Sequence, residues 1–147
     1  MSGVRVGACA GGATVKPLAP NAEYPWDMQG VGMDLVEIGE VSDSIETFGE
    51  KYLGRVFTSA ERNECGTSPA RLAERFAAKE AILKALHADG PVPLAAIDTR
   101  AAGRGQLTVH LTAEAATLAG RRGVVSIGVS VSRAHGQAAA VAATRAT

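Results

Sequence analysis

The sequence contains few aromatic residues, and its charges cancel. Only 4% of its 147 residues are Phe, Trp or Tyr, whereas 46% are hydrophobic, so an aliphatic, alanine-rich interior is expected. The 15 basic and 15 acidic side chains give a formal net charge of zero. No overall field therefore attracts nucleic acid or an anionic membrane, and we expect neither as a partner.

Cysteines and long apolar runs are also scarce. Cys9 and Cys65 are the two cysteines, far apart and in no CxxC or Cys/His spacing, which argues against a structural zinc site and a disulfide-stapled secreted domain. No apolar run approaches the roughly 18 residues of a membrane span, and no signal-peptide core opens the chain. Phosphate-loop, dinucleotide-binding and nucleophile-elbow motifs are missing from the sequence. A cytoplasmic location is expected.

The first 27 residues differ in composition from the rest of the chain. Residues 1–27 contain four glycines and three prolines without a sustained period, and are predicted to be a flexible leader. Residues 28–147 are long enough for one domain with one core. From Val31 the apolar residues alternate through a short strand, which places Asp34 on the same side as Gly32.

Further stretches of the chain carry signals for helices and strands. In chain order we expect a helix capped by Ser42 or Asp43, a helix opened by the capping box of Thr58 and Glu61, a long helix from about Arg71 to His87, a hairpin of Ala96–Arg100 and Gln106–Leu111, a helix capped by Thr112, and two final strands. Strands and helices do not alternate regularly. The predicted class is α+β, with a largely antiparallel sheet packed against one long helix and shorter helices.

The long helix carries charge where an amphipathic helix would carry apolar side chains. At about 100° per residue, Lys79 falls within the stripe that Leu72 and Leu83 mark, and Glu80 and Lys84 lie on its flank, with alanines on the far side. A buried charge is costly unless it is paired or bound to an ion. Two interpretations remain open: an ordinary i,i+4 pair of Glu80 with Lys84, or one wall of a ligand site.

A strand carboxylate, Asp34, and a helix carboxylate, Glu80, both lie beside apolar faces. Two carboxylates brought together repel each other unless a cation lies between them. Magnesium is the natural candidate, because it is usually held by one or two carboxylates together with a substrate phosphate. The alternative for Asp34 is a turn cap or a pair with an arginine, and the spacing does not decide between the two.

Four motifs resemble, in order, the holo-acyl-carrier-protein synthases, which are small phosphopantetheinyl transferases. They are "GVGMDLVEI", "FTSAE", "LAERFAAKEAILKAL" and an "SVS" strand, and the resemblance covers Met28 to Thr147. It implies a homotrimeric α+β fold that binds coenzyme A between subunits. It also implies transfer of the phosphopantetheine arm to a serine of an apo acyl carrier protein, with release of adenosine 3′,5′-bisphosphate.

The resemblance also assigns roles to individual residues. Asp34 and Glu80 become ligands of Mg²⁺, and Glu80 could also take the proton of the attacking serine. Lys84 reaches the same phosphates and shares the catalytic role with Glu80. Arg75 and Lys79 are expected to face the nucleotide end of coenzyme A.

Two departures from the family pattern bear on function, whereas the proline missing from the hairpin turn around Gly105 is ordinary loop variation. Arg133 stands where the family carries a histidine, and we expect it to hold a phosphate of coenzyme A. Glu40 stands where the family often carries an arginine that meets the acidic carrier protein. Two functions therefore stay open: a working transferase for fatty-acid or polyketide carriers, or a divergent paralogue that keeps the trimer and the coenzyme A cleft as a binding or assembly subunit.

Overall fold

The structure is a computed structural model that describes residues 28–146, so the predicted leader of residues 1–27 lies outside it. Its elements are β1 (Met28–Glu37), α1 (Ile38–Phe48), α2 (Glu50–Val56), α3 (Ser59–Cys65), α4 (Pro69–Ala85), the 3₁₀ helix η1 (Leu94–Ala96), β2 (Ile97–Gly103), β3 (Gln106–Leu111), α5 (Ala113–Arg121), β4 (Val124–Ala134) and β5 (Gln137–Ala146). The strands form one sheet in the order β1-β5-β4-β3-β2, and every neighbouring pair is antiparallel. The predicted α+β class is confirmed.

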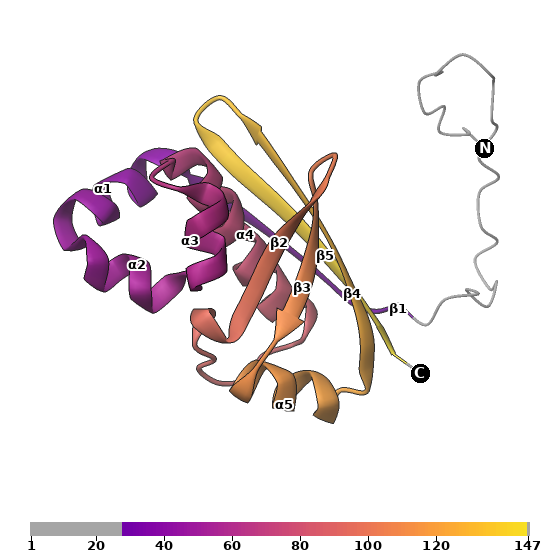
Figure 1. Cartoon of the computed structure of the whole chain (residues 1–147). Helices are drawn as coiled ribbons and strands as arrows, with labels where there is room; N and C mark the ends of the chain where they lie inside the picture. The colour runs from indigo at the N-terminus through magenta and orange to yellow at the C-terminus, as the bar shows by residue number, and fades with distance from the viewer. Residues whose placement is uncertain (1–27, 147) are drawn as a thin grey trace, which may run out of the picture.

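Helix α4 lies along one face of the sheet, against β1, β5 and β4 (Figure 1). Two glycines of β1 let the helix backbone approach the strand. A Cβ atom added at Gly32 would lie 2.0 Å from the carbonyl oxygen of Ala81, and one added at Gly30 would lie 2.1 Å from that of Ala85. No side chain fits at either position, so glycine is required by contact and not by backbone conformation.

The alanine side of α4 was expected to lie opposite the buried stripe, and the structure corrects this prediction. Ala78, Ala81 and Ala85 are at most 1% exposed, as are Leu72 and Ile82. Because small side chains allow close approach, the alanines form the contact with the sheet while the larger residues pack elsewhere. The helix is therefore buried around most of its circumference.

The first helix begins earlier than the sequence predicted. It starts at Ile38, directly after β1, and its N-cap residue makes no side-chain capping bond. The backbone N–H of Ile38 instead donates to the carbonyl oxygen of Gly136 at 2.9 Å, so a contact with the β4–β5 turn starts the helix. Gly49, with a φ of +53°, then separates α1 from α2.

The other predicted elements are present with small shifts at their ends. Thr58 and Glu61 form the predicted capping box of α3, and the β2–β3 hairpin and the two final strands are confirmed. Thr112 is the N-cap residue of α5 but makes no side-chain capping bond to it. None of the helices within residues 28–146 is long and apolar enough to cross a membrane.

The face of β1 that points away from α4 is apolar and exposed. Val31, Met33 and Leu35 are between 54% and 62% exposed. In the neighbouring strand β5, Val141 lies opposite Met33 in the register and is 45% exposed. The alternation of β1 therefore presents a hydrophobic row on one face and Gly32 and Asp34 toward α4 on the other.

Replacement of Gly32 by alanine tests the close approach of α4. The new methyl group would lie 2.0 Å from a backbone oxygen, so the helix must move, and we expect the free energy of unfolding to fall by about 1–3 kcal/mol or more. Gly128→Ala in β4 is the matched control, because no atom lies within 4 Å of the added Cβ. Urea unfolding followed by circular dichroism measures both, and equal stabilities would contradict the close contact.

Candidate active site

Asp34 and Lys84 meet where β1 lies against the last turn of α4. The Nζ atom of Lys84 lies 2.9 Å from Oδ1 of Asp34 and also donates to the carbonyl oxygen of Met33 at 3.1 Å. The hydrogen bond to Asp34 is the main cause that raises the pKa of Lys84, so its ammonium charge is retained. The side chain of Lys84 is 53% exposed and that of Asp34 is 18% exposed, which leaves the pair accessible from solvent.

Glu80 lies one helical turn before Lys84 and faces the same site. Burial raises the pKa of its carboxyl group first, and the negative charge of Asp34 raises it further, while Lys84 opposes both. The two carboxylates are therefore close enough to repel each other. The structure brings together the three residues that the sequence placed at the centre of the site, Asp34, Glu80 and Lys84.

The chemistry of this donor set fits a magnesium ion. Among residues 28–146 no group of three or more His, Cys, Asp or Glu side chains is arranged to enclose a metal. Mg²⁺ needs no such cage, because it keeps several waters and is usually bound by one or two carboxylates and by substrate phosphates. Asp34 and Glu80 could supply those two carboxylates, and a cation between them would relieve their repulsion.

The structure places Lys79 differently from the prediction that it faces the nucleotide. Its side chain is 0% exposed, and its Nζ atom lies 2.6 Å from Oε2 of Glu61. Burial is the main cause that lowers the pKa of Lys79, and the charge of Glu61 opposes this effect. The apolar stripe of α4 that contains Lys79 thus faces the packed interior, where Lys79 forms an ion pair. At Lys79 it is not the wall of a ligand cleft.

Arg75, which was also predicted to face the nucleotide, is likewise enclosed within the chain. It is 4% exposed, donates to the carbonyl oxygen of Thr99 at 2.6 Å, and forms an ion pair of 2.7 Å with Glu64. Burial acts to raise the pKa of Glu64, but the hydrogen bonds and charge of Arg75 and the backbone N–H of Ala101 outweigh it and lower that pKa. In a single chain both Arg75 and Lys79 therefore connect α4 to neighbouring elements.

Comparisons with known proteins identify the family. Residues 30–142 match the model of the 4′-phosphopantetheinyl transferase superfamily. The chain belongs to this superfamily. It is 43% identical over 98 residues to a holo-[acyl-carrier-protein] synthase of Paramagnetospirillum magneticum, covering 63% of this chain and 74% of that protein. It is 36% identical over 110 residues to the synthase of Dehalococcoides mccartyi, covering 75% and 92% respectively.

A solved structure supports the same assignment. The Helicobacter pylori holo-[acyl-carrier-protein] synthase in complex with coenzyme A aligns with a TM-score of 0.69 and 25% identity, over 78% of this chain and 98% of that one. The resemblance of the sequence motifs to the holo-acyl-carrier-protein synthases is thereby confirmed. The matched range of the superfamily contains Asp34, Glu80, Lys84 and Arg133.

The two departures from the family pattern lie at different places in the fold. Arg133, near the end of β4, forms an ion pair with Glu74 in the first half of α4. Glu40 is exposed in the first turn of α1, where the helix dipole favours a negative charge. α1 further carries Asp43 and Glu46 and has no basic residue, so its exposed surface is acidic.

Three acidic partners of predicted site residues were missed by sequence reasoning: Glu61, Glu64 and Glu74. Glu61 was assigned only to a capping box, although it is 0% exposed and pairs with Lys79. A buried lysine in an apolar stripe needs an anionic partner, so the unexplained position of Lys79 was a signal that such a residue existed. Nothing in the local sequence marked Glu74 as the partner of Arg133.

Asp34→Asn tests the coupling of the two carboxylates without metal. Removing the charge of Asp34 leaves burial as the cause that raises the pKa of Glu80, so that pKa should fall toward its ordinary value. An acid with a raised pKa in the folded protein destabilises the fold as pH rises through that pKa, and the variant should show less of this loss. Carbon-13 NMR titration of Glu80 measures the shift, and an unchanged or higher pKa would contradict the pairing.

Proposed function

We propose that the protein transfers the 4′-phosphopantetheine arm of coenzyme A to a serine of an acyl or polyketide-type carrier protein and releases adenosine 3′,5′-bisphosphate. Family membership and the names of the relatives support this reaction. The observation that carries it is the meeting of Asp34, Glu80 and Lys84 at the junction of β1 and α4. The apo carrier protein is the acceptor, and the cytoplasm is the proposed location.

The reaction needs positioning and charge neutralisation more than covalent chemistry. The serine oxygen attacks the phosphorus that bears the pantetheine arm, and the bond from that phosphorus to the bridging oxygen breaks. Glu80 accepts the serine proton, directly or through a water, and Lys84 neutralises charge on the phosphates. Asp34 and Glu80 would hold Mg²⁺, which when bound stabilises the charge that develops on the phosphate oxygens.

Arg133 is proposed as a further phosphate ligand. Its guanidinium group suits bidentate contact with a phosphate and keeps its charge at any physiological pH. In the structure this group is occupied by Glu74. A phosphate of coenzyme A would therefore have to replace or share that carboxylate, which weakens the contribution of Arg133 to binding.

The transfer assay is the direct test of the proposed function. Incubation with coenzyme A, Mg²⁺ and several apo carrier proteins should give the mass shift of phosphopantetheine on the carrier. Asp34→Ala and Glu80→Ala should abolish the shift, because each removes one of the two proposed ligands of Mg²⁺. The fold should be kept, because each also removes one of two repelling charges. Full activity of Asp34→Ala would rule out the assigned site.

The same assay separates the second candidate function. The replacement of the family histidine by Arg133, paired with Glu74, favours a divergent paralogue that binds coenzyme A without transferring it. Binding of coenzyme A in calorimetry, with no transfer to any carrier, would support the paralogue. Absence of binding at every magnesium concentration would end both proposals.

We further propose that three chains assemble through the exposed face of β1 and β5. The row of Val31, Met33 and Leu35 is more than half exposed, and large apolar patches of this kind mark interaction surfaces. The site is also open, since Lys84 is 53% exposed in one chain. A neighbouring subunit would cover the apolar row and complete the binding site for coenzyme A.

Light scattering tests the assembly. The parent should give about three times the chain mass of 15.0 kDa. Met33→Glu places a charge in the centre of the apolar row and should give monomers, whereas Glu46→Gln on α1 is a control that leaves the row intact. An active protein that is a strict monomer would contradict a site shared between subunits.

The acidic surface of α1 sets an expected carrier preference, if this helix meets the carrier as the family resemblance implies. Carriers of this type are acidic around the target serine, so Glu40 opposes their approach, mainly in the association rate. Glu40→Arg should raise kcat/KM for a strongly acidic carrier by several-fold, and the gain should shrink as salt increases. Steady-state kinetics at low and high salt measure this, and a gain that is equal at both would point to a cause other than charge.

A further inference from the structure

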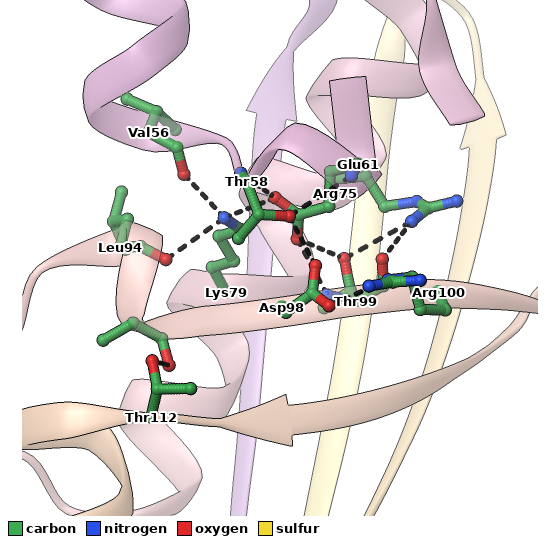
Figure 2. Close-up of polar contacts among 11 residues, drawn as sticks. Val56, Thr58, Glu61, Arg75, Lys79, Leu94, Asp98, Thr99, Arg100 and Thr112 are labelled. Carbon is green, nitrogen blue, oxygen red and sulfur yellow. Dashed lines mark hydrogen bonds and ion pairs between the residues drawn. The ribbon is translucent and has the colours of Figure 1, made fainter. Parts of the chain in front are cut away.

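On its interior side, α4 carries one buried ammonium group, that of Lys79, whose hydrogen-bonding partners are all within the chain. Nζ of Lys79 donates to the carbonyl oxygen of Val56 at 2.6 Å and to that of Leu94 at 3.1 Å, and it pairs with Glu61 at 2.6 Å (Figure 2). It also lies 5.5 Å from the centre of the Phe57 ring. One atom of α4 thus holds the end of α2, helix α3 and helix η1.

The carboxylate of Glu61 extends these contacts to β2. Its Oε1 accepts from the backbone N–H of Thr99 at 2.8 Å and from the hydroxyl of Thr99 at 2.7 Å, while Oε2 accepts from the N–H of Thr58 at 2.9 Å (Figure 2). Among the described residues no buried side-chain nitrogen or oxygen is left without a partner. The network is therefore complete around two charges that are each 0% exposed.

Stability alone does not account for this pair. A buried ion pair commonly contributes no more than well-packed apolar residues of the same size, because both charges lose their hydration. An apolar pair, however, would make no directional hydrogen bonds. Three acceptors around one ammonium fix where Lys79 lies along the axis of α4 and how far the helix is turned about it.

Glu80, the next residue, depends on that orientation. At 100° per residue, Glu80 lies between Lys79 on one side and Ala81 on the other, and the carbonyl oxygen of Ala81 is the atom in close contact with Gly32. The helix is thus held from two nearly opposite sides, with Glu80 on the side between them. A turn of about 20° would move a carboxylate about 5 Å from the axis by about 2 Å, enough to separate it from Asp34.

We propose that the buried Glu61–Lys79 pair is a positioning pair that fixes the rotation and axial position of α4, so that Glu80 meets Asp34. The inference rests on the proposed function, since it assigns the pair to the carboxylate site of the transfer reaction. Neither Glu61 nor Lys79 touches the substrate in this role. Their effect reaches the site through the backbone of α4.

The double variant Glu61→Gln/Lys79→Met tests the pair. It removes both charges at nearly constant volume and keeps an oxygen toward Thr99, so a cooperative fold is expected. Binding of Mn²⁺, measured from the EPR signal of the free ion in the presence of adenosine 3′,5′-bisphosphate, should weaken about 10-fold to 100-fold, as should kcat in the transfer assay. Glu61→Gln alone serves as the second variant if the double variant does not fold.

Leu118→Ala is the matched control for a loss of stability as such. Leu118 is 3% exposed in α5, which packs against β4 and η1, so its truncation lowers the melting temperature through a cavity in the core. Its Mn²⁺ affinity and kcat should equal those of the parent. A pair that only stabilises the fold would give the double variant the same behaviour as this control.

The outcomes separate the positioning role from the proposed reaction. A folded double variant, or a folded Glu61→Gln, with parental Mn²⁺ affinity overturns the inference. A parent that binds Mn²⁺ but transfers to no carrier overturns the proposed transferase, while the metal measurement still decides the positioning role. A parent that binds no Mn²⁺ removes the site that the pair would position and overturns the inference as well.

Discussion

The close contact of α4 with β1 is the constraint on which the rest of the structure depends. Gly30 and Gly32 bring the helix backbone onto the strand, since any side chain there would collide with a carbonyl oxygen of Ala81 or Ala85. Two residues after Gly32, the period of the strand returns Asp34 to the same face. At that distance Lys84 reaches Asp34 directly at 2.9 Å, and Glu80 lies near enough for its pKa to respond to the charge of Asp34. Small residues in the seam therefore determine where the charged residues meet.

The charges of α4 divide into two sets with opposite environments. Lys79 and Arg75 point into the chain. Each pairs with a glutamate of α3 and donates to a backbone carbonyl oxygen, in α2 for Lys79 and in β2 for Arg75. Glu80 and Lys84 point toward the edge where β1 lies, and Lys84 remains half exposed. The inner charges lose their hydration on burial, but their contacts fix the orientation of α4. The outer charges stay accessible to a ligand. A single helix can thus serve as both scaffold and site, because residues one position apart face different surroundings.

Much of this arrangement could be predicted from the sequence, because several signals are local. The capping box of Thr58 and Glu61 and the strand that carries Asp34 each follow from a short pattern. The role of the alanine side of α4 could not, since it depends on glycines about fifty residues earlier in the chain. The partner of Lys79 was missed for the same reason: the helical period placed Lys79 on the apolar stripe, but its pairing with Glu61 depends on tertiary contacts. The resemblance to the family supplied the assignment of Asp34 and Glu80 to one site, which spacing alone left open.

The central claim is that the junction of β1 and α4 binds a divalent cation together with a diphosphate. Crystals grown with Mn²⁺ and coenzyme A test it most directly, because the anomalous signal of manganese locates the ion without reference to activity. The account predicts one strong anomalous peak within coordination distance of both Asp34 and Glu80, about 2.0–2.3 Å from a carboxylate oxygen of each, with Lys84 in contact with a phosphate. A peak bound elsewhere, or coenzyme A bound with its phosphates away from these three residues, would contradict it.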